Sequence, residues 1–376
     1  MSQLNHFHAL LAAVFLAAAC SSPQKESVPI YVWQNVSYQT SSDTLMQHFV
    51  DWKRHGVTGV CISARDLDQI REASAMAHAV GLEYHAWTPS MLRSGLPHEW
   101  YAINRLGESS DVHPNYVDSY RFLDPANPEV QDYLLEQYTT IAQIPDVDYV
   151  CLDFIRYPDV ILANALIKSY GLNSMNGEYA PADYCYCDNC VETFKQQMGI
   201  DIREVEDPST VVQWAQFRCD QITLFVDKVV NAVHNLGKKV SVDVFPGPSS
   251  YAEHMVRQQW NQWMADMFFP MNYNTYYEEG PEWLSSVVEE EVESAGKDPI
   301  ISSLRLASDP HRVDANLQPD YTGLLPSELG IAIHNSLSNG ASGICLFNGN
   351  RITAEYWSAL EEAIKAESDY RRKTKG

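Results

Sequence analysis

Short β-rich runs alternate with longer helical patterns along this chain, and that alternation constrains the fold more than any other feature. Eight runs rich in β-branched and aromatic residues are expected to form strands, at 30–34, 59–64, 82–87, 149–154, 240–245, 267–272, 300–305 and 343–348. Amphipathic patterns at 44–54, 67–80, 128–144, 211–236, 327–338 and 354–365 predict helices between and after them. Strands that alternate with helices form parallel βαβ units, and eight such units close into a barrel. The pattern predicts a single (β/α)8 TIM barrel over residues 29–366, followed by a basic tail at 367–376.

Two connections in this pattern are too long to be simple turns. One runs from residue 87 to residue 128 after the third predicted strand, and the other runs from 157 to 211 after the fourth. Structureless loops longer than about 15 residues are uncommon in a compact domain unless they are functional or disordered. Both follow the C-terminal ends of strands, where barrel active sites form. We therefore expect them to border a functional site.

The N-terminal segment has the composition of a targeting signal. Residues 9–19 form an apolar run of signal-peptide length, which is too short to span a bilayer. The run ends at Cys20 and resembles a bacterial lipoprotein signal, in which such a Cys is lipidated and becomes the new N-terminus. The resemblance implies a signal peptide at 1–19, a linker at 20–28, and a lipid anchor that holds the chain at the bacterial cell envelope, on the outer membrane or its periplasmic face. The alternative is a plain secretory signal with a fortuitous Cys.

The charge balance of the chain limits the class of partner. The formal net charge is −23, and residues 1–19 contain no Lys, Arg, Asp or Glu, so the mature chain keeps all of it. An acidic surface repels polyanions, which disfavours nucleic acid as a partner. The sequence also lacks a phosphate-binding Gly loop, a nucleotide fingerprint and a Ser nucleophile elbow.

Asp153, at the end of the fourth predicted strand, is the leading catalytic candidate. Asp148 stands at the start of this strand, on the face that serves stability, whereas Asp153 stands on the face where barrels react. Arg156 follows three residues later, close enough to form an ion pair with Asp153 or with a substrate. An Arg neighbour lowers a carboxyl pKa and keeps the group ionised, as a nucleophile requires. The alternative is a purely structural Asp–Arg pair.

The second candidate carboxylate is Asp243, near the end of the fifth predicted strand. Side chains alternate between the two faces of a strand, so Asp243 shares the inward face with Asp153. The same alternation points the thiols of Cys61, Cys151 and Cys345 into the barrel as core groups. Two inward carboxyls at this end of a barrel can act together, and we assign Asp153 as nucleophile or charge stabiliser and Asp243 as general acid/base. The alternative for Asp243 is an interior carboxylate paired with an Arg.

Three motifs in the same order resemble those of the glycosyl-hydrolase-like family 10 barrels. Around the fourth strand, Asp148, Asp153, Tyr157 and Pro158 match the family motif, while Tyr149 replaces a Gly and Phe154 replaces a second acid. Residues 123–130 resemble a Leu-Asp-Pro-x-x-Pro-x-Val segment, in which Asn127 is expected to cap a helix and Pro128 to take its first position. Residues 270–273 resemble a Pro-Met-x-Tyr segment at the end of strand six. The resemblance implies a glycosidase-like TIM barrel.

Several other strand-end groups could line a sugar pocket. Aromatic rings suit the C–H face of a saccharide, and amide, imidazole and guanidinium groups suit its hydroxyls. The predicted substrate-binding residues are Trp33, Gln34, His85, Trp87, Asn272, Tyr273, Arg305 and Asn348. For each one alone, the alternative is packing in the core.

Three cysteines within six residues form the second strong motif. Cys185, Cys187 and Cys190 have a metal-ligand spacing that suits tetrahedral zinc. Cys219 is the predicted fourth ligand, with a His as an alternative, and the cluster resembles a zinc site found after strand four in some barrel β-galactosidases. Oxidation of the four thiols to two disulfides is the alternative. We expect a structural zinc and no cofactor for catalysis, because no His-rich strand end could hold a catalytic ion.

Together these features predict a glycoside hydrolase that acts on an oligo- or polysaccharide outside the cytoplasm. The alternative hypothesis is a catalytically inactive barrel lipoprotein that binds glycans. Phe154, in place of a second acid, favours the inactive barrel, whereas Asp153 with Arg156 favours the enzyme.

Overall fold

The structure is a computed structural model, and it describes residues 28–36, 40–64, 66–172, 177–309, 311 and 322–374. The predicted signal peptide and the predicted lipidation site at Cys20 lie outside the described residues. Within the part of the chain that the structure describes, no helix is both long enough and apolar enough to cross a membrane.

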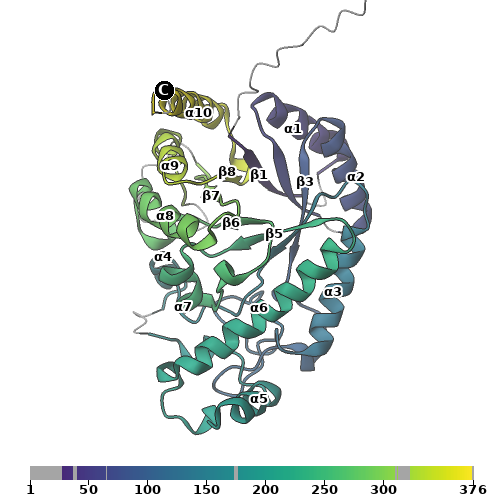
Figure 1. Cartoon of the computed structure of the whole chain (residues 1–376), viewed down its shortest axis with the longest axis vertical. Helices are drawn as coiled ribbons and strands as arrows, with labels where there is room; N and C mark the ends of the chain where they lie inside the picture. The colour runs from purple at the N-terminus through teal and green to yellow at the C-terminus, as the bar shows by residue number, and fades with distance from the viewer. Residues whose placement is uncertain are drawn as a thin grey trace, which may run out of the picture.

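Eight parallel strands form a barrel, as the alternating pattern predicts (Figure 1). They are β1 (Ile30–Asn35), β2 (Gly59–Ser63), β3 (Glu83–Pro89), β4 (Tyr149–Asp153), β5 (Lys239–Val244), β6 (Met267–Pro270), β7 (Ile301–Arg305) and β8 (Gly343–Phe347). Consecutive strands are neighbours from β1 to β6, and β8 pairs with both β1 and β7. Two isolated parallel bridges, Phe268 to Ile300 and Met271 to Ser303, join β6 to β7 and complete the ring.

The described residues form ten α-helices, and most of them cover the outside of the barrel (Figure 1). They are α1 (Ser42–Arg54), α2 (Leu67–Ala79), α3 (Pro128–Ala142), α4 (Asn164–Ser169), α5 (Asp188–Met198), α6 (Val212–His234), α7 (Glu253–Val256), α8 (Leu284–Ala295), α9 (Pro326–Ser338) and α10 (Ala354–Thr374). The start of α3 follows the predicted chemistry, because the Asn127 side chain accepts a hydrogen bond from the Glu129 amide and Pro128 takes the first turn. Helix α10 continues past residue 366, so the predicted boundary of the tail falls inside a helix.

The alternation of side chains along the strands separates two apolar cores. Aliphatic side chains of one parity, such as Val150 and Leu152, pack outward against the helices in the larger core. Side chains of the other parity, which include Tyr149, Cys61 and Cys345, fill the inside of the barrel. Cys151 is fully buried and neighbours Cys61 there. The prediction that these three thiols are core groups is therefore confirmed, and the same parity turns Asp153 and Asp243 inward.

The long connections after β3 and β4 pack against each other. Asn104 of the first forms an antiparallel bridge with Tyr184 of the second, and the Tyr186 amide donates to the Ile103 carbonyl at 2.7 Å. The second connection carries α4 and α5, and Figure 1 shows α5 beyond α6, far from α10. The two connections therefore form one extension of the barrel, built from segments that are distant in sequence.

Candidate active site

A cavity of about 470 Å³ opens at the C-terminal ends of the strands. Side chains from most of the strands line it, among them Trp33, Trp87, Asp153, Asp243, Tyr273, Arg305 and Phe347. This is the end at which (β/α)8 barrels place their active sites, because the loops that follow the strands meet there. The volume lies in the range of small-ligand sites.

Asp153 ends β4 at this cavity and is nine-tenths buried. One carboxylate oxygen accepts a hydrogen bond from the Trp87 indole at 3.1 Å, and the other accepts from the Phe154 amide at 2.6 Å. The Phe154 backbone has a φ of +50°, a conformation that is uncommon for non-glycine residues and tends to occur at functional sites. The strained turn after β4 thus aims an amide at the carboxylate and fixes its orientation.

Asp243, on β5, lines the same cavity and is buried. The Cys151 thiol lies beside it, with a sulfur–oxygen distance of 3.8 Å, and a hydrogen bond from the Trp87 side chain favours its ionised form. Burial raises the pKa of Asp243 well above its ordinary value, and the neighbouring Cys151 and Asp153 raise it further. Burial also raises the pKa of Asp153, to about 6, although the Phe154 amide, Arg156 and Trp87 oppose that shift. The two carboxyls therefore interact, and Asp153 is the one whose charge is supported by two N–H donors.

The predicted effect of Arg156 on Asp153 is only partly right. The ion pair of Arg156 is with Asp159, at 2.8 Å between Nη1 and Oδ2, and both residues are buried. Arg156 also donates to the Tyr120 hydroxyl at 3.0 Å, and the same hydroxyl bonds Asp159. Arg156 still favours the ionised form of Asp153, but burial outweighs it, so the pKa of Asp153 goes up and not down. Asp153 and Asp159 are each three residues from Arg156 in the sequence. Because the chain turns after Asp153, the Arg156 guanidinium pairs with Asp159.

Aromatic rings form most of the cavity wall. Trp33 lies edge-on to Trp87 with ring centroids 5.6 Å apart, and it lies against Phe347 at 4.7 Å. Phe347 also contacts Tyr273, with ring centroids 5.2 Å apart. The guanidinium of Arg305 lies 5.6 Å from the centre of the Phe347 ring. The structure therefore brings the predicted residues Trp33, Trp87, Tyr273 and Arg305 together in one wall.

Other cavity residues were not among those predicted from the sequence. Phe347, Tyr120, Asp159, Tyr170, Tyr276 and Tyr277 also line the cavity. Most of them belong to the long connection after β3 or to the loops after β4 and β6. Periodicity could not identify them, because it reports strand faces and carries no information on how loops fold back. Phe347 is the exception, because the alternation of side chains along β8 already predicts that it points into the barrel.

Three predicted substrate-binding residues, His85, Asn272 and Gln34, are buried away from the cavity. His85 lies inside the barrel near the start of β3, stacked on Tyr149 with ring centroids 4.2 Å apart, and its nitrogens bond Ser241 and Glu83. His85 precedes Trp87 by two residues on β3, so it points to the same face but lies deeper in the barrel, toward the N-terminal ends of the strands. Its predicted place at the rim is therefore wrong.

Asn272 and Gln34 also point elsewhere. The Asn272 amide donates to Glu291 at 3.1 Å and to Ser302 at 3.0 Å, fully buried behind the β6–β7 seam. Gln34 has the outward parity on β1, and its amide bonds the Asn35 carbonyl and the Asn350 side chain.

Asn348, just past β8, caps a turn by accepting from the Asn350 amide. It does not appear among the side chains that line the cavity. Loops and side-chain parity, and not the position at a strand end alone, decide which groups face a ligand.

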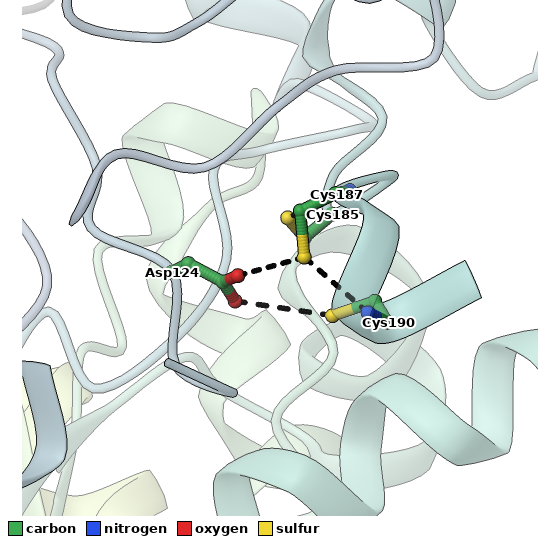
Figure 2. A group of neighbouring side chains, drawn as sticks. All are labelled: Asp124, Cys185, Cys187 and Cys190. Carbon is green, nitrogen blue, oxygen red and sulfur yellow. Dashed lines mark hydrogen bonds between the residues drawn. The ribbon is translucent and has the colours of Figure 1, made fainter. Parts of the chain in front are cut away.

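The cysteine motif gathers a different fourth residue from the one predicted. Figure 2 shows the side chains of Asp124, Cys185, Cys187 and Cys190 converging, and their ligand atoms all lie within 4.8 Å of one another. Cys219 is not in this group. Its neighbour Arg218 faces the motif and bonds Asp183 and the Tyr184 carbonyl. Cys219 is the next residue on α6, about 100° further around the helix, so its thiol faces elsewhere.

Comparison with known proteins finds one family model that matches this chain. Residues 101–296 match the model of the family DUF4015, described as "Putative glycosyl hydrolase domain". No curated protein matches the sequence.

Solved structures with the same fold share little sequence with this chain. The catalytic domain of β-amylase from Paenibacillus polymyxa has a TM-score of 0.57 and 10% identity, over 90% of this chain and 98% of the other. The spore cortex-lytic enzyme SleL from Bacillus megaterium QM B1551 has a TM-score of 0.52 and 10% identity, over 91% and 75%. A class V chitinase from Pseudomonas fluorescens Pf-5 has a TM-score of 0.51 and 10% identity, over 90% and 100%. At these identities the likeness shows the fold alone.

Proposed function

Because the chain belongs to the glycosyl hydrolase domain family DUF4015, we propose that it is a glycoside hydrolase that cleaves O-glycosidic bonds of an oligo- or polysaccharide. One observation carries this proposal. Two buried, interacting carboxyls, Asp153 and Asp243, lie in one aromatic-lined cavity at the reactive end of the barrel. Paired carboxyls with different environments are the arrangement that hydrolyses a glycosidic bond.

Each carboxyl has a separate role in the proposed reaction. Asp153 accepts two N–H hydrogen bonds that support its negative charge, so it acts as nucleophile or as stabiliser of the oxocarbenium-like transition state. Asp243 has Trp87 as its one N–H neighbour and a strongly raised pKa, so it holds the proton and delivers it to the leaving-group oxygen. Trp87 positions Asp153, while Trp33 and Phe347 offer rings on which a sugar can stack.

The finer kinship and the location of the enzyme are also part of the proposal. The matches at Asp148, Asp153, Tyr157 and Pro158 favour the glycosyl-hydrolase-like family 10 barrels. The apolar run that ends at Cys20 supports a lipid-anchored enzyme at the cell envelope. Labelling with a fatty acid in cells would test the anchor, since a Cys20→Ala variant should lose the label, and equal labelling of both chains would rule it out.

The experiment that tests the proposal is a screen of wild-type protein against a panel of plant, fungal, bacterial and host glycans. We expect release of new reducing ends from at least one glycan. The matched blank is the double variant Asp153→Asn/Asp243→Asn, purified in the same way, because any activity that it shares with wild type comes from contaminants. If no glycan yields more product with wild type than with the double variant, the protein is not a glycoside hydrolase of the panel's substrates.

A second candidate function has one observation in its favour. Phe154 stands where the resembling family has a second acid, which suits a barrel that binds glycans without cleaving them. The same panel distinguishes the two functions when binding is measured beside cleavage. Binding of a glycan that wild type leaves intact, with affinity lost in a Trp33→Ala variant, would support the inactive barrel.

The pKa values predict the acid side of the pH profile. Asp153 must be ionised to act, and burial raises its pKa to about 6. Below that pH the protonated fraction grows, so log kcat/KM is expected to fall about tenfold per pH unit. At higher pH the rate falls again as Asp243 loses its proton. The measurement is initial rates from pH 4 to pH 10, with circular dichroism at each pH as the control for folding. A rate that stays constant between pH 4 and pH 6 would contradict the role of Asp153.

A further inference from the structure

A group of one carboxylate and three thiols lies outside the cavity and takes no part in the proposed reaction. Asp124 comes from the connection after β3, whereas Cys185, Cys187 and Cys190 come from the connection after β4 and the first turn of α5 (Figure 2). Asp124, Cys185 and Cys190 are buried, and Cys187 is half-buried. Among the described residues, this is the only such convergence of three or more His, Cys, Asp or Glu side chains.

The spacing of the four ligand atoms suits a tetrahedral ion. Ligand atoms on a tetrahedron around zinc, with Zn–S near 2.3 Å, lie about 3.5–3.8 Å apart. Here all four lie within 4.8 Å of one another, with Cys187 Sγ 3.0 Å and Cys190 Sγ 4.0 Å from the Asp124 oxygens. Shifts of less than about 1 Å would therefore place all four around one ion.

The backbone around the group favours ionised sulfur. The Cys185 sulfur accepts from the amides of Ile103 and Cys187, and the Cys187 sulfur accepts from the Cys190 amide, each at 3.4 Å. Amides that point at sulfur stabilise a thiolate, the form that binds metals. The Ala126 amide holds one oxygen of Asp124 in the same way, at 2.9 Å. Hydrogen bonds of this kind orient ligands before a metal binds.

We propose that Asp124, Cys185, Cys187 and Cys190 bind one zinc ion as a closed structural site. Three thiolates and one carboxylate suit zinc better than magnesium or calcium, which take oxygen ligands. Four protein ligands leave no position for a substrate, and none of them lines the active-site cavity. The ion ties the connection after β3 to the connection after β4, and so supports the extension that carries part of the cavity wall.

A route for the ion to enter is present. Asp124 and Cys187 line a second surface pocket, together with Arg105 and Arg203. Cys187 is the ligand that remains partly exposed, so an ion can reach the thiolates from solvent on that side. Arg203 donates to the Tyr186 carbonyl at 2.7 Å and forms an ion pair with Asp188 at 2.7 Å.

A disulfide is the competing state of these thiols. The cysteines of the described residues are all free in the structure, including the three of the motif. Three thiols can make only one disulfide among themselves, which would leave one thiol beside a buried carboxylate. The zinc site satisfies all four groups at once.

The test is the metal content of the intact protein, purified without chelator and measured by inductively coupled plasma mass spectrometry. We expect one zinc per wild-type chain. Cys187→Ser, at the exposed ligand, should retain less than a tenth of that amount, and Asp124→Asn should lower zinc affinity at least tenfold. Cys219→Ser is the matched control, because it removes a buried thiol outside the site and should keep one zinc per chain.

A second measurement covers the case in which the ligand variants fail to fold. Wild-type protein reconstituted with Co²⁺ should show the strong visible bands of a tetrahedral ion and sulfur-to-cobalt charge transfer. Wild type that holds no zinc and carries a disulfide within the motif by peptide mass analysis would overturn the proposal. Loss of zinc in Cys219→Ser equal to that in Cys187→Ser would also overturn it. The failure of any glycan to be cleaved would not, because the site is independent of the reaction.

Discussion

Replacing Asp153 by Asn is expected to reduce kcat/KM by on the order of 10⁴-fold on every glycan that the wild type cleaves. The substitution keeps the size of the side chain, and its one remaining oxygen can still accept from either the Trp87 indole or the Phe154 amide. It removes the negative charge that would attack or stabilise the anomeric carbon. The loss therefore affects the chemical step. The affinity of the variant for a reaction product is expected to differ far less from that of wild type.

Replacing Asp243 by Asn is expected to have an effect that depends on the leaving group. General acid catalysis contributes about 10²–10⁴-fold, and it matters most when the departing oxygen is basic. Asp243→Asn should therefore lose at least about a hundredfold on a natural glycan and much less on an aryl glycoside with an acidic phenol. Steady-state rates on both kinds of substrate, for both single variants, separate the two roles.

The matched control for these variants lies just before β4, at the end of that strand opposite to Asp153. Asp148 precedes β4 at its other end, where it bonds His78 and accepts from the Tyr84 amide. Asp148→Asn removes a carboxylate of the same kind far from the cavity, so its kcat/KM should stay within about threefold of wild type. An Asp148→Asn loss as large as that of Asp153→Asn would show that charge near β4, and not position at the cavity, causes the effect.

Replacing Asp183 by Asn is expected to lower the free energy of unfolding by about 3–5 kcal/mol. Asp183 is fully buried in the connection after β4 and forms an ion pair with Arg218 of α6, which is also buried. It accepts a further hydrogen bond from the Tyr186 hydroxyl at 2.6 Å. Asn leaves the guanidinium charged and without its counter-ion in the interior, and that desolvated charge is what destabilises the variant.

An exposed pair on the same helix provides the comparison. Lys228 of α6 contacts Asp132 of α3 at 3.0 Å, but both side chains are largely exposed. Asp132→Asn should therefore change stability by less than about 1 kcal/mol. Urea unfolding followed by circular dichroism measures both variants under one set of conditions. If the two substitutions lower the free energy of unfolding by similar amounts, the buried Asp183–Arg218 pair stabilises the protein no more than an exposed pair does.

The strand pattern predicted the barrel well because it depends on local sequence. All eight strands lie within two residues of the predicted ranges at their starts and ends, and inward parity placed Asp153, Asp243 and the core thiols on the correct face. Parity also explains one error, since Gln34 stands next to Trp33 and so faces the opposite side of β1.

The remaining errors concern contacts between segments that are distant in sequence or turned by local geometry. Asp124 lies 61 residues before Cys185, and only the folding of one long connection against the other brings them together. Cys219 follows Arg218 on a helix, where one residue changes the direction of the side chain by about 100°. His85 had the right parity but the wrong depth, which a period of two does not report.

Neighbouring strands of the barrel are not all paired to the same extent. Ladders of four or five paired residues join most neighbouring strands, whereas β6 and β7 meet only through two isolated bridges. Local opening of a protein starts where few backbone hydrogen bonds must break. Amide protons along this seam should therefore exchange with solvent sooner than those of β2 or β3. Tyr273 and Arg305 flank the seam at the cavity, so local opening of the seam would widen the cavity on this side.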